Sequence, residues 1–177
     1  TNIHAFDISV EGETSYIGSG RVTGTAQDQF SMSEYNGDIR VASTTDSWGR
    51  WWLTEGGRWE VIEPQNHITV LRNNDAGSLD ELSHLGGIAE GERIWSARFV
   101  GDMAYLVTFR NVDPLWTIDL SDPENPTILG ELEGPGVSTY IHPLSNGDLR
   151  TIGMPGGENG VGLDWRTTPL DVCNTGA

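Results

Sequence analysis

Three polar side chains, Glu34, Arg98 and His142, are the residues of this sequence best suited to chemistry. Each stands in a short run of apolar, aromatic and hydroxyl residues that is typical of a strand. If the three strands lie side by side, a carboxylate, a guanidinium and an imidazole converge, and such places bind small ligands or cations. The alternative is an internal set of hydrogen bonds and ion pairs, because a buried arginine must be paired.

A second group of possible ligands lies in an acidic turn, where Asp119 and Asp122 stand three residues apart. Carboxylate oxygens at such a turn suit Ca²⁺, which takes oxygen ligands. The alternative is a turn without metal, in which the Asp side chains accept hydrogen bonds from backbone N–H groups and Pro123 restricts the backbone. The spacing differs from the D-x-[DN]-x-[DN]-G loop of EF-hands, and both interpretations stay open.

Residues 46–66 form a tryptophan-rich insertion that contains four of the seven Trp residues. The glycine-rich sequence at 55–57 predicts that the insertion folds back as a hairpin. On a projecting hairpin, Trp51 and Trp52 are candidates for stacking on a carbohydrate or anchoring a protein partner. The alternative is that these rings cover the face of a neighbouring sheet, since large exposed apolar patches are uncommon on soluble proteins.

The sequence lacks the short motifs of several enzyme classes. It contains no H-E-x-x-H, G-x-S-x-G or Walker A sequence, and its four histidines show no zinc-ligand spacing. Paired carboxylates that come from separate strands leave no local pattern, however. The alternative to a protein without catalytic activity is therefore a hydrolase or lyase that uses converging carboxylates. Ca²⁺ would be an optional cofactor of such an enzyme.

The acidic composition narrows the class of partner. The 177 residues include 26 Asp and Glu against 10 Lys and Arg, a formal net charge of −16. This charge repels phosphate backbones, so nucleic acid is not an expected partner. No apolar run is long enough for a membrane span, and the first residues do not resemble a signal peptide. Because the chain begins without Met, we expect a processed product or a piece of a longer protein.

The elements that must position these residues are short antiparallel strands joined by tight turns. The turns recur at Asn36-Gly37, Gly101-Asp102 and Asn146-Gly147, with the glycines 64 and 46 residues apart, a spacing typical of propeller blades. We predict one complete blade with strands at 94–100, 104–109, 115–120 and 127–132, and a preceding blade at 29–35, 39–44, 67–71 and 79–85. Partial blades are predicted at 3–10 and 15–22, and at 139–144, 148–153 and within 161–172.

The predicted fold class is therefore all-β, a partial β-propeller of about three to four four-stranded antiparallel blades in a single segment spanning residues 1–177. The first strand of each blade lines the channel of a propeller, which places Glu34, Arg98 and His142 there. Closed propellers have four to eight blades, and unpaired strand edges attract further strands. We expect a homodimer, or the remainder of a longer parent chain, to complete the ring.

Residues 91–115, GERIWSARFVGDMAYLVTFRNVDPL, are followed by TIDLSDPENP at 117–126 and YIHP at 140–143. These stretches resemble a family of secreted bacterial proteins with a C-terminal β-propeller domain, distantly similar to WD40 repeats. The resemblance implies a propeller fold and an exported parent protein, located outside the cell or in its envelope, and carries no established activity. We therefore predict a binding or scaffolding module for an extracellular or envelope ligand, either a carbohydrate or a protein.

Overall fold

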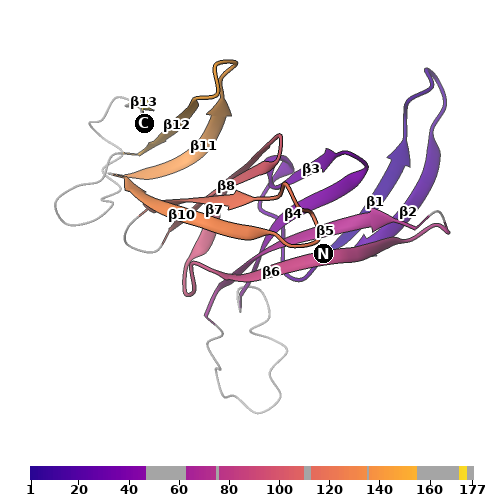
Figure 1. The fold of residues 1–177 in the computed structure, drawn as a ribbon, viewed down its shortest axis with the longest axis horizontal. Helices are drawn as coiled ribbons and strands as arrows, with labels where there is room; N and C mark the ends of the chain where they lie inside the picture. Colours follow the sequence, from indigo (N-terminus) through magenta and orange to yellow (C-terminus); the bar gives the residue numbers. More distant parts are fainter. Residues whose placement is uncertain (47–62, 75, 110–112, 135, 155–171, 175–177) are drawn as a thin grey trace, which may run out of the picture.

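The computed structural model describes residues 1–46, 63–74, 76–109, 113–134, 136–154 and 172–174. These residues form thirteen β-strands and one short 3-10 helix, η1 (Gln29–Ser31). The strands make four antiparallel sheets, each in sequence order (Figure 1). Contacts between β2 and β6, between β4 and β7 and between β7 and β11 join the consecutive sheets. The all-β, partial propeller fold expected from the sequence is thus confirmed.

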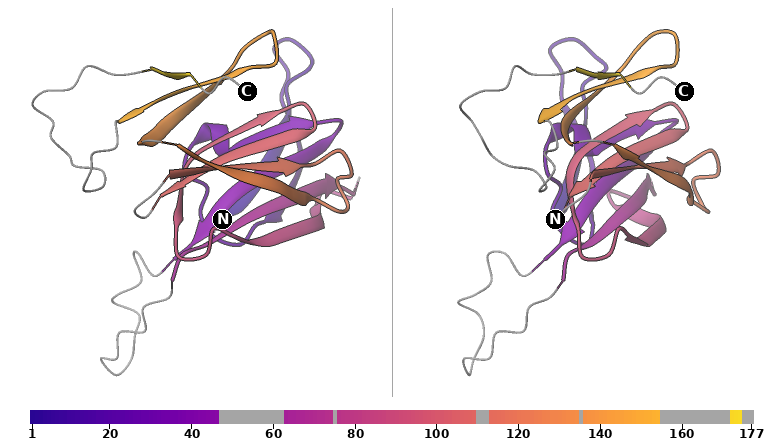
Figure 2. Two further views of the ribbon diagram at one scale, coloured as in Figure 1. Left: turned by 60° about the vertical axis from the view of Figure 1, so that its left-hand side comes forward. Right: turned by 90° about the vertical axis from the view of Figure 1, so that its left-hand side faces the viewer.

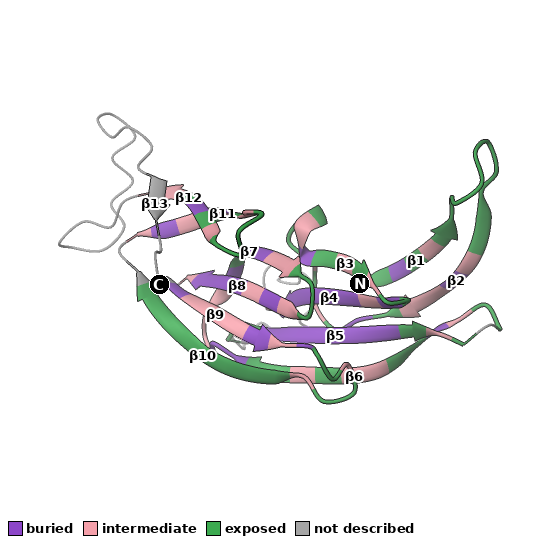
Figure 3. Cartoon of the chain, turned by 45° about the horizontal axis from the view of Figure 1, so that its top comes forward, coloured by how far each residue is buried: buried purple, intermediate pink, exposed green. Residues whose placement is uncertain are grey.

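Blade 3 is the complete blade predicted in the middle of the chain. It consists of β7 (Arg93–Val100), β8 (Met103–Phe109), β9 (Asp113–Asp119) and β10 (Thr127–Gly134). The central strand β8 is mostly buried, whereas the described side chains of the outer strand β10 are exposed (Figure 3). The predicted bounds agree with the observed ones to within about two residues, because alternating apolar residues and turns between strands are local signals.

Blade 2 also has four strands, and one predicted boundary in it is wrong. It consists of β3 (Met32–Tyr35), β4 (Asp38–Thr45), β5 (Gln65–Asn73) and β6 (Leu79–Ile88). The first predicted strand, 29–35, is strand only from Met32, because Asp28 caps η1: its Oδ1 accepts hydrogen bonds from the N–H groups of Phe30 at 2.8 Å and Ser31 at 3.1 Å. The tight turn is confirmed, with positive φ at Asn36 (53°) and Gly37 (85°).

The two flanking sheets are smaller. The first, blade 1, pairs β1 (Asn2–Asp7) with β2 (Ser15–Arg21), and the last, blade 4, pairs β11 (Val137–Pro143), β12 (Leu149–Met154) and β13 (Val172–Asn174). Strand β1 ends at Asp7, three residues before the end of the predicted strand 3–10. Of the predicted segment 161–172, only Val172 is among the described residues, and it belongs to β13. Figure 2 shows the same succession of sheets from two further directions.

The largest apolar core joins blades 2 and 3. Its buried members come from β4 to β9 and from the links between them: Ala42, Ile68, Ile88, Ala89, Ile94, Ala97, Ala104, Leu106, Ile118 and Leu120. A second core of Ile3, Val22, Val41, Leu71 and Leu79 joins blades 1 and 2. Removal of this apolar surface from water is the main force that holds consecutive sheets together.

The buried side-chain amide of Asn66 links β4, β6 and β7 where blade 2 meets blade 3. Asn66, fully buried, accepts a hydrogen bond from the Thr44 hydroxyl at 2.7 Å and from the N–H of Ile94 at 3.2 Å. Its Nδ2 donates to the carbonyl oxygens of Ile88 at 2.9 Å and Glu92 at 3.0 Å. One side chain thereby supplies partners to backbone groups on both sides of the link from β6 to β7, where buried N–H and carbonyl groups need hydrogen bonds.

In the part of the chain that the structure describes, no helix has the length and apolar character of a membrane span.

Candidate functional site

The candidate site lies on the first strands of blades 3 and 4, together with η1 in front of blade 2. Strand β7 contacts β11, β3 and η1. Arg98 on β7 donates from Nε to the carbonyl oxygen of Ile141 at 2.9 Å and from Nη2 to the hydroxyl of Tyr140 at 2.9 Å. The Tyr140 hydroxyl is in turn 3.2 Å from Nδ1 of His142. Arg98 and His142, both predicted from the sequence, are thus linked through Tyr140.

Two aromatic rings flank the Arg98 guanidinium. Its central carbon is 4.2 Å from the centroid of Phe30 and 5.2 Å from that of Tyr140, and the two rings meet edge to face at 5.4 Å. Arginine over an aromatic face gains cation–π attraction and stays in one orientation. We call Phe30, Arg98, Tyr140 and His142 the inner-strand cluster.

The hydrogen bonds of this cluster have one consistent direction. The Tyr140 oxygen accepts from Arg98, so its own hydrogen is available to His142 Nδ1. A neutral His142 then carries its proton on Nε2. His142 is exposed and Arg98 is half-buried, and among the described residues Nη1 of Arg98 makes no hydrogen bond. The cluster therefore presents the Nη1 amino group of Arg98 and one imidazole N–H group beyond its internal contacts.

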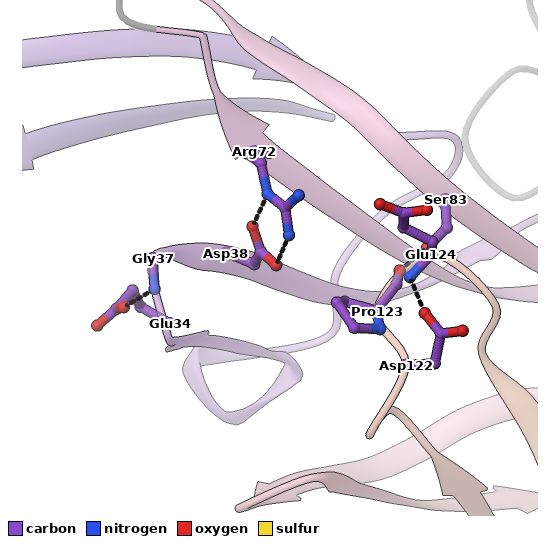
Figure 4. A network of polar contacts seen from close by, with 8 residues as sticks. All are labelled: Glu34, Gly37, Asp38, Arg72, Ser83, Asp122, Pro123 and Glu124. Atoms are coloured by element: carbon purple, nitrogen blue, oxygen red, sulfur yellow. Dashed lines mark hydrogen bonds and ion pairs between the residues drawn. The ribbon is translucent and has the colours of Figure 1, made fainter.

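Glu34, the third residue predicted for this place, is directed elsewhere. Its carboxylate accepts the N–H of Gly37 at 2.9 Å in the β3–β4 turn, where Glu34 is exposed (Figure 4). Sequence reasoning missed Phe30 and Tyr140. Tyr140 had a usable signal, because residues two apart on a strand share a face and Tyr140 precedes His142 by two. Phe30 had none, because η1 interrupts the strand pattern.

A second polar network lies at the turns between blades 2 and 3 (Figure 4). Arg72 on β5 forms a two-point ion pair with Asp38, through Nε at 2.6 Å and Nη2 at 2.7 Å. Ser83 on β6 donates to the carbonyl oxygen of Pro123 at 2.6 Å. The side-chain hydrogen bond to Asp38 raises the pKa of Arg72 above its ordinary value. The Ser83 contact connects β6 of blade 2 to the β9–β10 turn of blade 3, whereas the ion pair joins β4 and β5 within blade 2.

Arg40 on β4 also connects blade 2 to blade 3, through a buried contact with the β7–β8 turn. It is almost fully buried and donates from Nη1 to the carbonyl oxygen of Gly101 at 2.6 Å and from Nη2 to Ser33 at 2.6 Å. The rings of Tyr35 and Phe99 lie 4.7 and 5.2 Å from its central carbon. Burial lowers the pKa of Arg40 from its ordinary value, but the side chain remains a cation because its polar contacts are satisfied.

The two predicted Ca²⁺ ligands occupy capping positions in the β9–β10 turn. Asp119 accepts the N–H of Ser121 at 2.8 Å, and Asp122 accepts the N–H of Glu124 at 3.0 Å and Nδ2 of Asn125 at 2.9 Å. These hydrogen bonds lower the pKa of both carboxyl groups. Both carboxylates thus make the contacts expected of a turn without metal, and Ca²⁺ binding at this turn stays a prediction.

Trp51, Trp52 and most of the predicted insertion at 46–66 lie outside the described residues. Within the described part of the chain, no group of three or more His, Cys, Asp or Glu side chains is placed to hold a metal ion. The arrangement that the described residues offer is therefore a cationic and aromatic surface, suited to binding by hydrogen bonds, charge and stacking.

Two consecutive four-stranded antiparallel sheets, flanked by a two-stranded and a three-stranded sheet, are typical of the blades of a β-propeller. The chain belongs to the family described as Beta propeller domain, which matches residues 1–172. It is 40% identical over 137 residues to an uncharacterized protein of Methanocaldococcus jannaschii, covering 77% of this chain and 20% of the relative. A second uncharacterized protein, from Archaeoglobus fulgidus, is 36% identical over 157 residues, covering 89% of this chain and 22% of the relative.

The chain therefore spans about a fifth of the length of the curated relatives it matches. Both relatives are archaeal, whereas the sequence resemblance was drawn to bacterial proteins. The propeller part of that resemblance is confirmed.

Proposed function

We propose that this propeller domain is a binding module that contacts a carboxylate group of its ligand through the inner-strand cluster. The observation that carries the proposal is the convergence of Phe30, Arg98, Tyr140 and His142 from three separate units of the fold. Arg98 retains an N–H group without a partner among the described residues, and His142 is exposed. Charged hydrogen bonds from arginine to carboxylate are among the stronger contacts that a protein surface makes.

We expect the ligand to be an acidic carbohydrate or an acidic protein segment outside the cytoplasm, an expectation supported by the sequence resemblance to exported proteins. The net charge of −16 opposes the approach of any anion, so the cluster must act through short-range contacts, while salt weakens the repulsion from the rest of the surface. A ring completed by a second copy or by further blades would bring additional first strands beside the cluster.

The catalytic alternative, a hydrolase or lyase with converging carboxylates, has less support from the described residues. The one carboxylate predicted for the channel, Glu34, accepts the N–H of Gly37 in its own turn and does not join Arg98 or His142. The inner-strand cluster supplies donors, which suit recognition of an anion.

The test is a nuclear magnetic resonance titration of the 177-residue chain with oligogalacturonate and with a poly-glutamate peptide. Binding at the cluster should shift the Arg98 Nε–H and His142 ring signals, and Arg98→Lys should weaken the affinity about tenfold, the cost of one charged hydrogen bond. Neutral xylo-oligosaccharide is the matched control ligand. Shifts confined to other residues, or equal binding by the Arg98→Lys variant, would show that the cluster is not the ligand site.

A further inference from the structure

A pair of histidines lies on blade 2, away from the inner-strand cluster. His67 on β5 and His84 on β6 face each other across the sheet, with Nδ1 of His67 3.1 Å from Nε2 of His84. His67 is only 7% exposed, whereas His84 is exposed. One imidazole is thus held within the sheet and the other reaches solvent.

The neighbours of His67 decide which of its nitrogens carries the proton. Thr45 donates its hydroxyl hydrogen to the carbonyl oxygen of Gln65 at 3.2 Å, so the Thr45 oxygen accepts from Nε2–H of His67 at 3.1 Å. A neutral imidazole has one N–H group, so Nδ1 of His67 directs a lone pair toward His84. Burial, and secondarily the nearby His84, lower the pKa of His67 and favour this neutral form.

This arrangement has the features of a metal ligand. Metal-binding histidines use one neutral nitrogen for the ion and donate the other N–H group to a fixed acceptor, which orients the ring. Thr45 is that acceptor for His67. The contact with Thr45 therefore holds the His67 ring, and with it Nδ1, in one orientation.

Residue 86, which lies beside both nitrogens, is a glycine and has no side chain to cover them. The pairing of β5 with β6 is irregular between Asn66 and Ile68, opposite this part of β6. A Cβ atom at Gly86 would lie 3.4 Å from Nδ1 of His67 and 3.5 Å from Nε2 of His84. The next nearest atom would be Cε1 of His67 at 3.9 Å. The three atoms nearest to that Cβ position are therefore all imidazole atoms of the two histidines.

The separation of the two nitrogens suits a shared ion. Metal–nitrogen bonds are about 2.0–2.1 Å long, so two such bonds that meet at roughly 100° place their nitrogens about 3.1 Å apart. We propose that His67 Nδ1 and His84 Nε2 together bind a divalent transition-metal ion of the kind that prefers imidazole, namely Cu²⁺, Ni²⁺ or Zn²⁺. The ion replaces the proton between the rings, and His84 then carries its proton on its solvent-facing Nδ1. Water completes the coordination.

Calorimetric titration of the 177-residue chain, prepared without a histidine tag, with Ni²⁺ and Zn²⁺ tests the site. We expect one ion per chain, and a loss of affinity of at least about tenfold in His84→Gln, which removes an exposed ligand without disturbing the core. His4→Gln is the matched control, because His4 is also an exposed strand histidine with an aromatic neighbour, Tyr16; it should bind as the unchanged chain does. Equal affinity in His84→Gln, or binding that disappears in Cys173→Ser instead, overturns the proposal.

Two further measurements locate the ion. Gly86→Ala keeps both imidazoles and puts a methyl group over the nitrogens, so it should weaken binding, and unchanged affinity would place the ion elsewhere and refute the site. Pulsed electron paramagnetic resonance of the Cu²⁺ form should show two imidazole ligands in the unchanged chain and one in His84→Gln. A single imidazole in the unchanged chain contradicts the shared site.

Discussion

The junction between blades 2 and 3 and the junction between blades 3 and 4 contain similar arginine contacts in different surroundings. In each, an arginine donates to a backbone carbonyl of the next blade and lies between two aromatic rings: Arg40 donates to Gly101, and Arg98 to Ile141. Arg40 is 4% exposed and sits beside the largest apolar core. Arg98 is half-buried and continues into Tyr140 and the exposed His142.

The two arginines therefore have different expected roles, a structural one for Arg40 and a ligand-binding one for Arg98. At the first junction the polar contacts are surrounded by packed side chains, so their loss leaves buried groups without partners. At the second junction solvent or a ligand can replace a lost contact. We therefore expect substitutions at the first junction to reduce stability and those at the second to affect binding.

Asn66→Ala should have the largest effect on stability and would break the first junction. It leaves the Ile88 and Glu92 carbonyls without their side-chain partner and removes one of the two side-chain acceptors of the Ile94 N–H. We expect the free energy of unfolding in urea to fall by about 3 kcal/mol or more, since each buried unsatisfied group costs about 1–3 kcal/mol.

The control for this experiment is Asn125→Ala, which removes an exposed amide that bonds only Asp122 among the described residues. Its urea midpoint should stay close to that of the unchanged chain. Similar losses in the two variants would mean that Asn66 does not connect the blades.

The paired substitutions Arg40→Lys and Arg98→Lys compare the two junctions directly. Lysine keeps the charge but loses the planar fork that donates and stacks. We expect Arg40→Lys to lower the free energy of unfolding by about 2 kcal/mol and Arg98→Lys by about 0.5 kcal/mol, because the Arg40 side chain is almost fully buried, whereas water can reach the half-buried Arg98. Urea unfolding of both variants measures the difference, and a larger loss for Arg98→Lys would reverse the assignment of roles.

The pH dependence of stability should change when His67 is removed. Its pKa is lowered in the folded state by burial and by His84, so below the unfolded value of about 6.5 the unfolded chain binds the additional proton. The contribution of His67 is fully present above that pH and is lost as the pH falls through the folded pKa. Urea midpoints measured at pH 7.5 and pH 5.5, about one unit above and below the unfolded pKa, should therefore differ less in His67→Gln than in the unchanged chain. An identical difference would show that His67 does not titrate in this range.

Asp122→Asn should have the smallest effect. Its carboxylate is exposed and caps the β9–β10 turn through the N–H of Glu124, and hydrogen bonding lowers its pKa. The small stabilisation from the charged form is present above the unfolded pKa and is lost at acid pH. Thermal unfolding at neutral pH should show a slight decrease, and the same measurement with added Ca²⁺ tests the metal prediction. Stabilisation by Ca²⁺ that Asp122→Asn abolishes would favour a metal at this turn.

Local patterns predicted most of the strands. Gly101-Asp102 and Asn36-Gly37 mark turns that only a few residue types can form, and the alternating runs beside them permit only one hairpin register. The prediction failed at Gln29–Ser31, where the side chain of Asp28 supplies hydrogen bonds that a strand would otherwise obtain from its neighbour. Such a cap competes with the sheet, and the alternation of residues does not reveal it.

The candidate site was predicted only in part. Arg98 and His142 were identified because they are polar residues on strands that begin blades, and both belong to the cluster. Glu34 met the same criterion but bonds its own turn. The tryptophan insertion at 46–66 lies largely outside the described residues.

Composition, turn residues and alternation were enough to establish an acidic, all-β chain made of repeated hairpins, because these properties depend on neighbours along the chain. The contacts of Arg98 with Phe30 and Tyr140, and of His67 with His84, join residues 68, 42 and 17 positions apart. They depend on how one blade is placed against the next and on an irregularity in strand pairing. Only the tertiary structure decides them, since a shift of one residue in register turns each side chain to the opposite face of its sheet.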